Sequence, residues 1–312
     1  MSLYCYLCIG DRMIMPKTIR IPNVNRDERI GSAFNFLFHI INDSENSEEE
    51  IIEWDFSDTS FFHPFFLAPL AIYKHRCNKK IVCKNCPTYM RDYFTAIAFE
   101  TPMHIQTTHN IESKLKPYKS KTYTPICAFP ASEEKVADEL QSILQSIIEK
   151  QTNYDRSVKT PLAYLLSEII CNINQHSCSE NGYIYAQYLK KEGCIDICIA
   201  DDGITIYGSY ANNAKYIDDI GNSEAKALRM ANEGFSTKDS PERGYGLNTS
   251  RKLLAKGMGG DFFMLSGSAF YRLSKDRDEV IELPKTIRWD GTIVLMRIPV
   301  SLPKNFNIYE YI

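Results

Sequence analysis

Three segments decide how this chain folds, and they occur in the order SEIICNINQHS (residues 167–177), CIADDGITI (198–206) and STKDSPERGYGLNTSRKLLAKGMGG (236–260). Apolar residues at helical spacing predict a helix over 161–177 that carries the first segment. The second segment ends a mostly apolar strand, 195–200, in the sequence Asp-Asp-Gly. In the third, a Gly-x-Gly sequence precedes a helix-patterned run, 247–256. Polar residues are therefore expected on a helix face, at a strand end and at a helix start.

The first segment brings a carboxylate and an amide together. Glu168, Asn172 and His176 repeat every four residues, so on a helix they project from one face. Mg²⁺ prefers oxygen ligands and keeps several waters, which makes the amide oxygen of Asn172 an adequate protein ligand. Glu168 lies one turn earlier and could accept a proton from water or from a substrate hydroxyl. His176 caps this helix, packs under it or takes a catalytic role.

The second and third segments carry the features of a nucleotide site. Asp201 ends a strand, and Gly203 allows close approach of a flat ligand, as a purine requires. Gly244 and Gly246 precede the helix that continues from Leu247, so free backbone N–H groups are available there for phosphate oxygens. Together these residues predict a base site and an anion site.

In this order the segments resemble the N, G1 and G2 boxes of the GHKL superfamily, the Bergerat-fold ATPases that include gyrase, histidine kinases and anti-sigma kinases. The resemblance covers residues 130–300 and implies an α/β sandwich with a mixed sheet and helices on one face. Its implied ligands are ATP and Mg²⁺. The closing strand, 293–298, follows Gly291-Thr292. The resemblance implies that Glu168 activates a nucleophile, that Asn172 binds magnesium and that Asp201 contacts the adenine. Gly203 would lie under the adenine, and Thr292 would support it. Phosphate contacts would come from Gly244, Gly246 and Leu247.

Two parts of the resemblance need comment. Thr205 stands where the family often has glycine, which predicts a stiffer loop after Asp201. Residues 206–243 form a long polar segment with a short helix predicted at 224–231. The resemblance implies that this segment is the ATP lid. Within the lid, Lys238 is either the charge that touches the phosphates or a surface lysine in a loop.

Composition bounds the class of protein. The chain has 312 residues, which favours two domains, and a net charge of −3 with 44% apolar residues, which does not favour general nucleic-acid binding. No apolar run is long enough to cross a membrane, and residues 1–20 lack the core of a signal peptide, so a cytoplasmic location is expected. The ten cysteines are scattered, as reduced thiols are. Cys5/Cys8 and Cys83/Cys86 have the C-x-x-C spacing of zinc knuckles, but packing as small apolar residues is favoured.

The first part of the chain alternates strands and helices. Strands are predicted at 3–9, 51–56 and 80–83, and helices at 27–41, from Pro64, and at 89–99. The pattern resembles a STAS domain, the small α/β module of anti-anti-sigma factors, over residues 1–112. The family's phosphorylatable serine is missing, because the corresponding residues 62–65 carry no hydroxyl. A docking or regulatory role is therefore expected.

The remaining boundaries follow from breaks in pattern. Pro117 among lysines and serines predicts a linker over 113–130, followed by the ATP-binding domain over 131–312. Within that domain the expected elements are a helix over 132–149 capped by Ser132, paired strands at 182–190 and 193–200, and a hairpin at 262–265 and 270–273.

Three functions stay open at this level. The first is an ATP-hydrolysing conformational switch regulated by the first module. The second is a serine/threonine protein kinase resembling anti-sigma kinases, which acts on a partner protein. The third is a module that binds ATP without hydrolysing it. A homodimer or a protein partner is expected to engage through the first module. Histidine autokinase activity is not expected, because residues 131–166 contain no histidine.

Overall fold

The computed structural model describes residues 15–24, 30–60, 63–237 and 246–311. The chain divides into two compact units, Met1–Thr101 and Pro102–Ile312. The strand predicted at 3–9 lies outside the described residues, as do Cys5 and Cys8. The described residues contain no helix that combines the length and the apolar character needed to span a bilayer.

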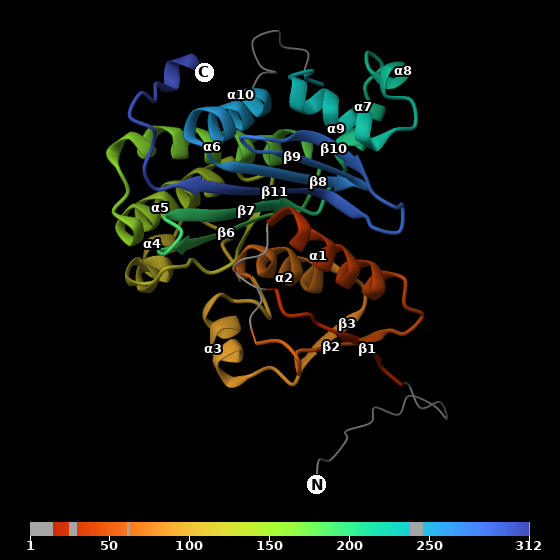
Figure 1. Ribbon diagram of the computed structural model, residues 1–312. Helices are drawn as coiled ribbons and strands as arrows, with labels where there is room; N and C mark the ends of the chain where they lie inside the picture. Colours follow the sequence, from red (N-terminus) through yellow and green to blue (C-terminus); the bar gives the residue numbers. More distant parts are fainter. Residues whose placement is uncertain (1–14, 25–29, 61–62, 238–245, 312) are drawn as a thin grey trace. The chain divides into compact units, whose positions relative to one another are not determined.

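The first unit is built on a three-stranded parallel sheet in the order β1-β2-β3 (Figure 1). Trp54 anchors α1 to this sheet, because its buried Nε1 donates to Ser44 Oγ at 3.0 Å and Ser44 in turn donates to the Ile40 carbonyl at 2.7 Å. The elements of this unit are β1 (Lys17–Arg20), α1 (Ile30–Glu45), β2 (Ile51–Asp55), α2 (Pro64–Arg76), β3 (Lys80–Lys84) and α3 (Thr88–Ala96).

Most predicted elements of the first unit are confirmed. The strands expected at 51–56 and 80–83 are β2 and β3, and α2 begins at Pro64, where the missing N–H has no partner to lose. The helix expected at 27–41 is α1, which continues to Glu45.

The second unit contains a mixed eight-stranded sheet in the order β10-β9-β8-β11-β7-β6-β5-β4. Neighbouring strands are antiparallel except β4 and β5, which are parallel. The last strand, β11, lies between β7 and β8 and so joins the end of the Asp201 strand to the hairpin. The strands are β4 (Met103–His104), β5 (Cys127–Pro130), β6 (Asn181–Leu189), β7 (Cys194–Asp201), β8 (Asp261–Gly267), β9 (Ala269–Leu273), β10 (Asp278–Glu282) and β11 (Trp289–Pro299).

Three helical segments share one apolar core with this sheet: α5 (Glu134–Thr152), α6 (Arg156–His176) and α10 (Gly246–Lys252), the last continued by the π-helix η2 (Leu253–Met258). Leu144 of α5, Leu166 of α6 and Ile197 of β7 are buried in it. In Figure 1 α5, α6 and α10 lie on the same side of the sheet. The paired strands and the hairpin expected from the sequence are present as β6–β7 and β8–β9.

Residues 113–130, expected to be a linker, belong to the second unit. They carry the end of α4 (Ile111–Leu115), the 3₁₀ helix η1 (Lys116–Ser120) and β5. Leu115 and Cys127 are fully buried in the core of that unit. Pro117 lies in the first turn of η1, where proline is well tolerated, and the boundary between the units follows Thr101. The lysines and serines of this segment are solvated faces of short elements.

The predicted lid also has more structure than expected. Besides α9 (Glu224–Glu233), it contains α7 (Ile206–Ala211) and α8 (Ile217–Ile220). The three helices enclose a small apolar core of their own, formed by Tyr210, Tyr216, Ile220, Ala227 and Met230. Two of these core residues are tyrosines. The prediction of a polar segment did not include them in a core.

Two helix starts differ from the expectation. Asp155 caps α6 by accepting the Ser157 N–H at 2.9 Å, so this helix begins before Pro161 and runs through it. Glu133, not Ser132, occupies the N-cap of α5, and its side chain makes no capping hydrogen bond. The chain ends with the 3₁₀ helix η3 (Ile308–Glu310).

Candidate functional site

A cavity of about 610 Å³ opens in the second unit among α6, the end of β7, the α7–α9 segment, the start of α10 and β11. This volume lies within the range of roughly 300 to 1,000 Å³ that small-molecule sites occupy. The predicted site residues that line it are Glu168, Asn172, Asp201, Thr205, Gly246, Leu247 and Thr292. Residues far apart in the sequence therefore meet at one cavity. Lys238 and Gly244 lie outside the described residues.

Helix α6 presents its polar face to this cavity because its opposite face is apolar. Val158, Leu162, Leu166 and Ile170 are buried in the core and do not line the cavity, whereas a second row, one turn apart, lines it. That row consists of Tyr164, Glu168, Asn172 and His176. The four-residue repeat read from the sequence is confirmed, and Tyr164 extends it by one turn. The sequence analysis missed Tyr164 although the same spacing includes it.

Glu168 meets the start of α10. A β-carbon placed on Gly246 would stand 1.8 Å from Glu168 Oε2. Real β-carbons do not approach another atom this closely, so any residue larger than glycine at position 246 must displace the carboxylate. Gly246 thus allows the backbone of α10 to lie directly against Glu168.

Asp201 is buried at the end of β7, with 3% of its surface exposed. Its Oδ1 accepts the Gly203 N–H at 3.0 Å. Gly291 lies on the same carboxyl group, because a β-carbon there would be 2.5 Å from Asp201 Oδ1, and its φ of +84° is in the left-handed region that favours glycine. Trp289 Nε1 donates to the Asp201 carbonyl at 3.3 Å. The start of β11 therefore fixes the end of β7.

Gly203 does not line the cavity. A β-carbon at this position would lie 1.9 Å from the Ser177 carbonyl oxygen, and the following N–H, that of Ile204, donates to the same oxygen at 2.6 Å. The sequence analysis interpreted this glycine as the floor under a flat ligand. In the structure its close approach is to the backbone at the end of α6, which joins the Asp201 loop to the helix that carries Glu168.

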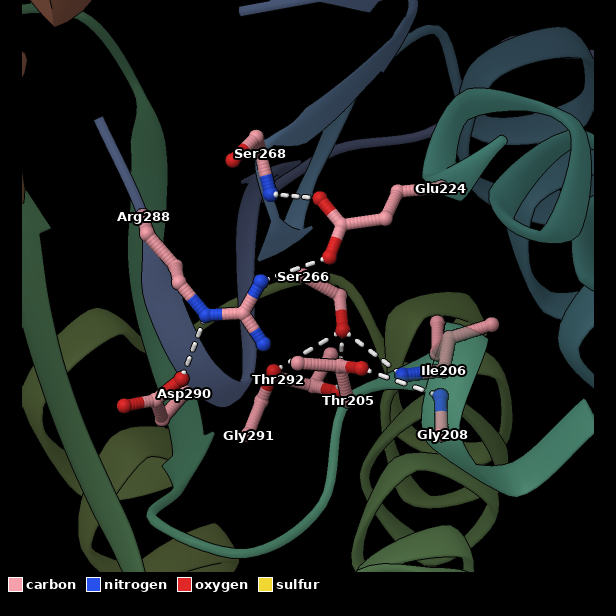
Figure 2. A network of polar contacts seen from close by, with 10 residues as sticks. All are labelled: Thr205, Ile206, Gly208, Glu224, Ser266, Ser268, Arg288, Asp290, Gly291 and Thr292. Atoms are coloured by element: carbon pink, nitrogen blue, oxygen red, sulfur yellow. Dashed lines mark hydrogen bonds and ion pairs between the residues drawn. The ribbon is translucent and has the colours of Figure 1, made fainter. Parts of the chain in front are cut away.

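Figure 2 shows a cluster of hydroxyl groups to which two cavity-lining residues, Thr205 and Thr292, belong. Thr205 Oγ1 accepts the Gly208 N–H at 3.0 Å and so caps α7. Ser266 Oγ accepts the Ile206 N–H and donates to the Gly291 carbonyl, both at 2.8 Å. A glycine at position 205 could not supply this cap, which gives the threonine a local reason.

Thr292 completes the cluster, because its Oγ1 lies 3.3 Å from Ser266 Oγ. Ser266 thereby connects the start of α7 with the end of β8 and the beginning of β11 (Figure 2). The sequence analysis missed Ser266, whose only signal is a polar residue at the end of the apolar run FFML.

An ion-pair network holds the first turn of α9 (Figure 2). Glu224 accepts from Arg288 at 2.7 Å and from the Ser268 N–H at 2.6 Å, and Arg288 also pairs with Asp290 at 2.8 Å. The network connects the α7–α9 segment to the β8–β9 turn and to the beginning of β11. The α7–α9 segment and β11, which both line the cavity, are thus tied to the β8–β9 turn.

Arg251 ties the other end of α9 to α10. Its guanidinium is buried and donates to the Asn232 carbonyl, to Tyr271 Oη and, at 3.0 Å, to Asn248 Oδ1. Burial raises the pKa of Tyr271, so this phenol stays protonated. Because these three acceptors and the Asp278 carboxylate of β10, at 3.5 Å, surround one permanent cation, α9, α10, β9 and β10 are held in a fixed relation.

The electrostatics of the cavity favour neutral tyrosines. Burial raises the pKa of Tyr164, and the charge of Glu168 raises it further, while a hydrogen bond with Thr249 has the opposite effect. Burial also raises the pKa of Tyr210, which donates to the Phe235 carbonyl. Both phenols are therefore hydrogen-bond donors near neutral pH.

The described residues hold no group of three or more His, Cys, Asp or Glu side chains that could bind a metal ion. Asn172 and Glu168 are thus too few to enclose a cation by themselves. A cation at this place would complete its coordination with oxygen atoms from a ligand or from water, as Mg²⁺ does in nucleotide sites.

Comparison of the chain with protein-family models and with curated proteins found no match.

Proposed function

We propose that this chain is a GHKL-type protein of the Bergerat fold that binds Mg²⁺-ATP in this cavity and hydrolyses ATP as a conformational switch. One observation carries the proposal. Glu168 and Asn172 of the helix motif, Asp201 of the strand-end motif and Gly246 and Leu247 of the helix-start motif line a single cavity together with Thr292 of β11, although they span more than a hundred positions of sequence.

The wall of the cavity near Asp201 suits an adenine base. Ile199, Met264 and Val294 supply apolar surface, and Asp201 supplies a buried carboxylate. An ionised carboxylate only accepts hydrogen bonds, so it favours a base with an exocyclic amino group. Thr205 and Thr292 add hydroxyl groups at the same end.

The part of the cavity lined by α6 and the start of α10 suits phosphates and their counter-ion. Gly246 and Leu247 begin α10 beside Glu168 and Asn172. The bound magnesium–ATP complex would supply the phosphoanhydride bond and the positive charge that balances it. Asn172 would offer its amide oxygen to the ion, and Glu168 would hold or accept the proton of an attacking water or hydroxyl. Gly244 and Lys238 are proposed to add phosphate contacts.

The α7–α9 segment supports the switch rather than a fixed pocket wall. Phe235, Ser236 and Thr237 line the cavity, and Asn213 Nδ2 donates to the Thr237 carbonyl at 2.9 Å. The same segment carries Ile217, of which 48% is exposed. A ligand that reorders residues 235–237 would therefore act on a segment that carries an exposed apolar side chain, and this is a means of signalling to a partner.

We propose that the first unit is a STAS-like regulatory module that works in the cytoplasm and engages a second copy or a protein partner. Its serines support docking rather than phosphorylation. Ser60 Oγ donates to Asn23 Oδ1 at 3.1 Å, and the Ser57 N–H donates to Asp55 Oδ1 at 3.0 Å, which is the arrangement of turn residues.

Incubation of the full chain with γ-labelled ATP and Mg²⁺ tests the proposal, with free phosphate separated from labelled protein and ATP binding measured by calorimetry. Release of free phosphate is expected. Label transferred to a protein substrate would instead identify a serine/threonine kinase, and binding without either product would identify a nucleotide sensor. Absence of binding would overturn the assignment of the cavity.

A further inference from the structure

The two thiols of the C-x-x-C sequence in the first unit lie side by side. Cys83 is in β3, and Cys86 follows its end. Between them Asn85 adopts a φ of +53°, a left-handed conformation that turns the chain back. The thiols of Cys83 and Cys86 are hydrogen-bonded to each other, and both residues are half-buried.

This turn is held independently of its thiols. Asn85 Nδ2 donates to Asp55 Oδ1 at 2.8 Å, the Phe56 N–H donates to the Lys84 carbonyl at 3.0 Å, and Arg91 Nη2 donates to the Cys86 carbonyl at 3.1 Å. Contacts from β2 and from α3 thus fix the backbone on both sides. The proximity of the thiols is therefore a property of the fold.

The two thiols differ in acidity, which assigns their roles. The hydrogen bond from Cys83 lowers the pKa of Cys86, and the charge of Arg91 lowers it further against the opposing effects of burial, Glu100 and Asp55. The same hydrogen bond, followed by burial and the charge of Glu100, raises the pKa of Cys83. Cys86 is therefore the thiol that ionises, and Cys83 retains its proton until Cys86 has reacted.

A zinc ion would need more ligands than this pair supplies. Structural zinc takes four ligands, and the described residues place no third His, Cys, Asp or Glu with this pair in a metal-binding group. Cys178 is exposed and serves as a reference for an ordinary surface thiol.

We propose that Cys83 and Cys86 form a thiol–disulfide exchange site whose substrate is a small disulfide of the glutathione type. In the first step the Cys86 thiolate attacks one sulfur of the disulfide, which forms a mixed disulfide and releases one thiolate. Cys83 then loses its proton and attacks Cys86 Sγ, which forms the Cys83–Cys86 bond and releases the second thiol. Overall, one small disulfide is reduced to two thiols as the pair is oxidised.

The test uses the full chain and oxidised glutathione, with quenching by iodoacetamide and mapping by mass spectrometry. We expect a Cys83–Cys86 disulfide as the end product, and alkylation of Cys86 in the reduced chain about tenfold faster than that of the exposed Cys178. Cys83→Ser should stop the reaction at the glutathione adduct of Cys86. Cys86→Ser should leave Cys83 unreactive.

Equal alkylation rates for Cys86 and Cys178, or a persistent glutathione adduct in the unsubstituted chain, would overturn the proposal. Release of zinc from the purified chain on oxidation would also overturn it and identify a metal site. Circular dichroism reports whether the serine variants fold, and the alkylation rates of the unsubstituted chain decide the matter if they do not.

Discussion

The carboxylate of Glu168 lies directly against the α-carbon of Gly246, so closely that a β-carbon there would be 1.8 Å from Oε2. This contact joins the proposed base to the start of the proposed phosphate-binding helix. Any change on one side of it should be felt on the other, and the first prediction uses this relationship.

Gly246→Ala should lower ATP turnover by about 10²- to 10⁴-fold, because the new methyl group displaces the carboxylate from the position of a general base. The fold should survive, since the displaced atom is the end of a flexible side chain. Phosphate release measures the effect. Gly208→Ala is the matched control, because its β-carbon would meet its nearest neighbours at an ordinary 3.5 Å. Adding Glu168→Gln to Gly246→Ala should cost little more, and fully additive losses would contradict a shared cause.

Glu168→Gln and Asn172→Ala should separate chemistry from binding. The glutamine keeps its size but accepts no proton, so turnover should fall by about 10²- to 10⁴-fold while ATP still binds. The alanine removes the proposed magnesium ligand, so affinity and turnover should both fall. Calorimetry and phosphate release distinguish the two results, with Glu149→Gln on the exposed side of α5 as a control. Parent-like turnover of Glu168→Gln would mean that α6 supplies no base.

Asp201→Asn should weaken ATP binding by about 1.5 to 3 kcal/mol, because an amide can turn its NH₂ toward the amino group of the base. Asp202→Asn is the natural control. Asp202 is adjacent, does not line the cavity and accepts from Tyr183 at 3.3 Å. Equal affinities for both variants by calorimetry would mean that the adenine does not bind at the Asp201 end of the cavity.

Arg297→Met should lower the free energy of unfolding by about 3 to 5 kcal/mol at neutral pH, because it leaves Asp196 buried without its bidentate partner. The two residues join β11 to β7 through contacts of 2.7 Å. Burial already raises the pKa of Asp196 against the effect of Arg297, and the substitution should raise it further. The loss of unfolding free energy should therefore be largest above the pKa of Asp196 in the folded variant. It should shrink as the pH falls through that pKa. Denaturant unfolding at acidic and neutral pH measures this, and a pH-independent loss would be evidence against a buried carboxylate.

The first unit should carry no phosphate on Ser57 or Ser60 after incubation with ATP, because both belong to the turn that follows β2. Peptide mapping by mass spectrometry provides the measurement. Phosphate on either serine would turn the proposed docking module into the substrate of a phosphorylation cycle.

Periodicity alone predicted the site helix, the Asp201 strand and the β8–β9 hairpin, because each has an apolar face that must be buried. It failed where short elements share a small core. Tyr210 and Tyr216 share one small apolar core with residues of α8 and α9, and this core makes α7 and α8 a packed unit. Likewise, the strand β5 is too short to show alternation, so residues 113–130 resembled a linker.

Site details depended on contacts that spacing does not encode. Glu168 and Tyr164 line the same cavity because they belong to a four-residue repeat on one helix. The role of Ser266 follows only from the meeting of β8, β11 and α7, and that of Gly203 from its contact with Ser177. Such contacts join segments separated by tens of residues, and a single sequence carries no record of them.

The position of β11 has a consequence for synthesis of the chain on the ribosome. Because this strand lies between β7 and β8, the strand that ends in Asp201 and the strand that contains Met264 have no hydrogen-bonded connection until residues 289–299 are present. Emerging nascent chain can fold α6 and the β6–β7 pair early, but the cavity closes only when its final strand inserts into the middle of the sheet. A chain that stopped before Trp289 would lose the centre of the sheet rather than its edge.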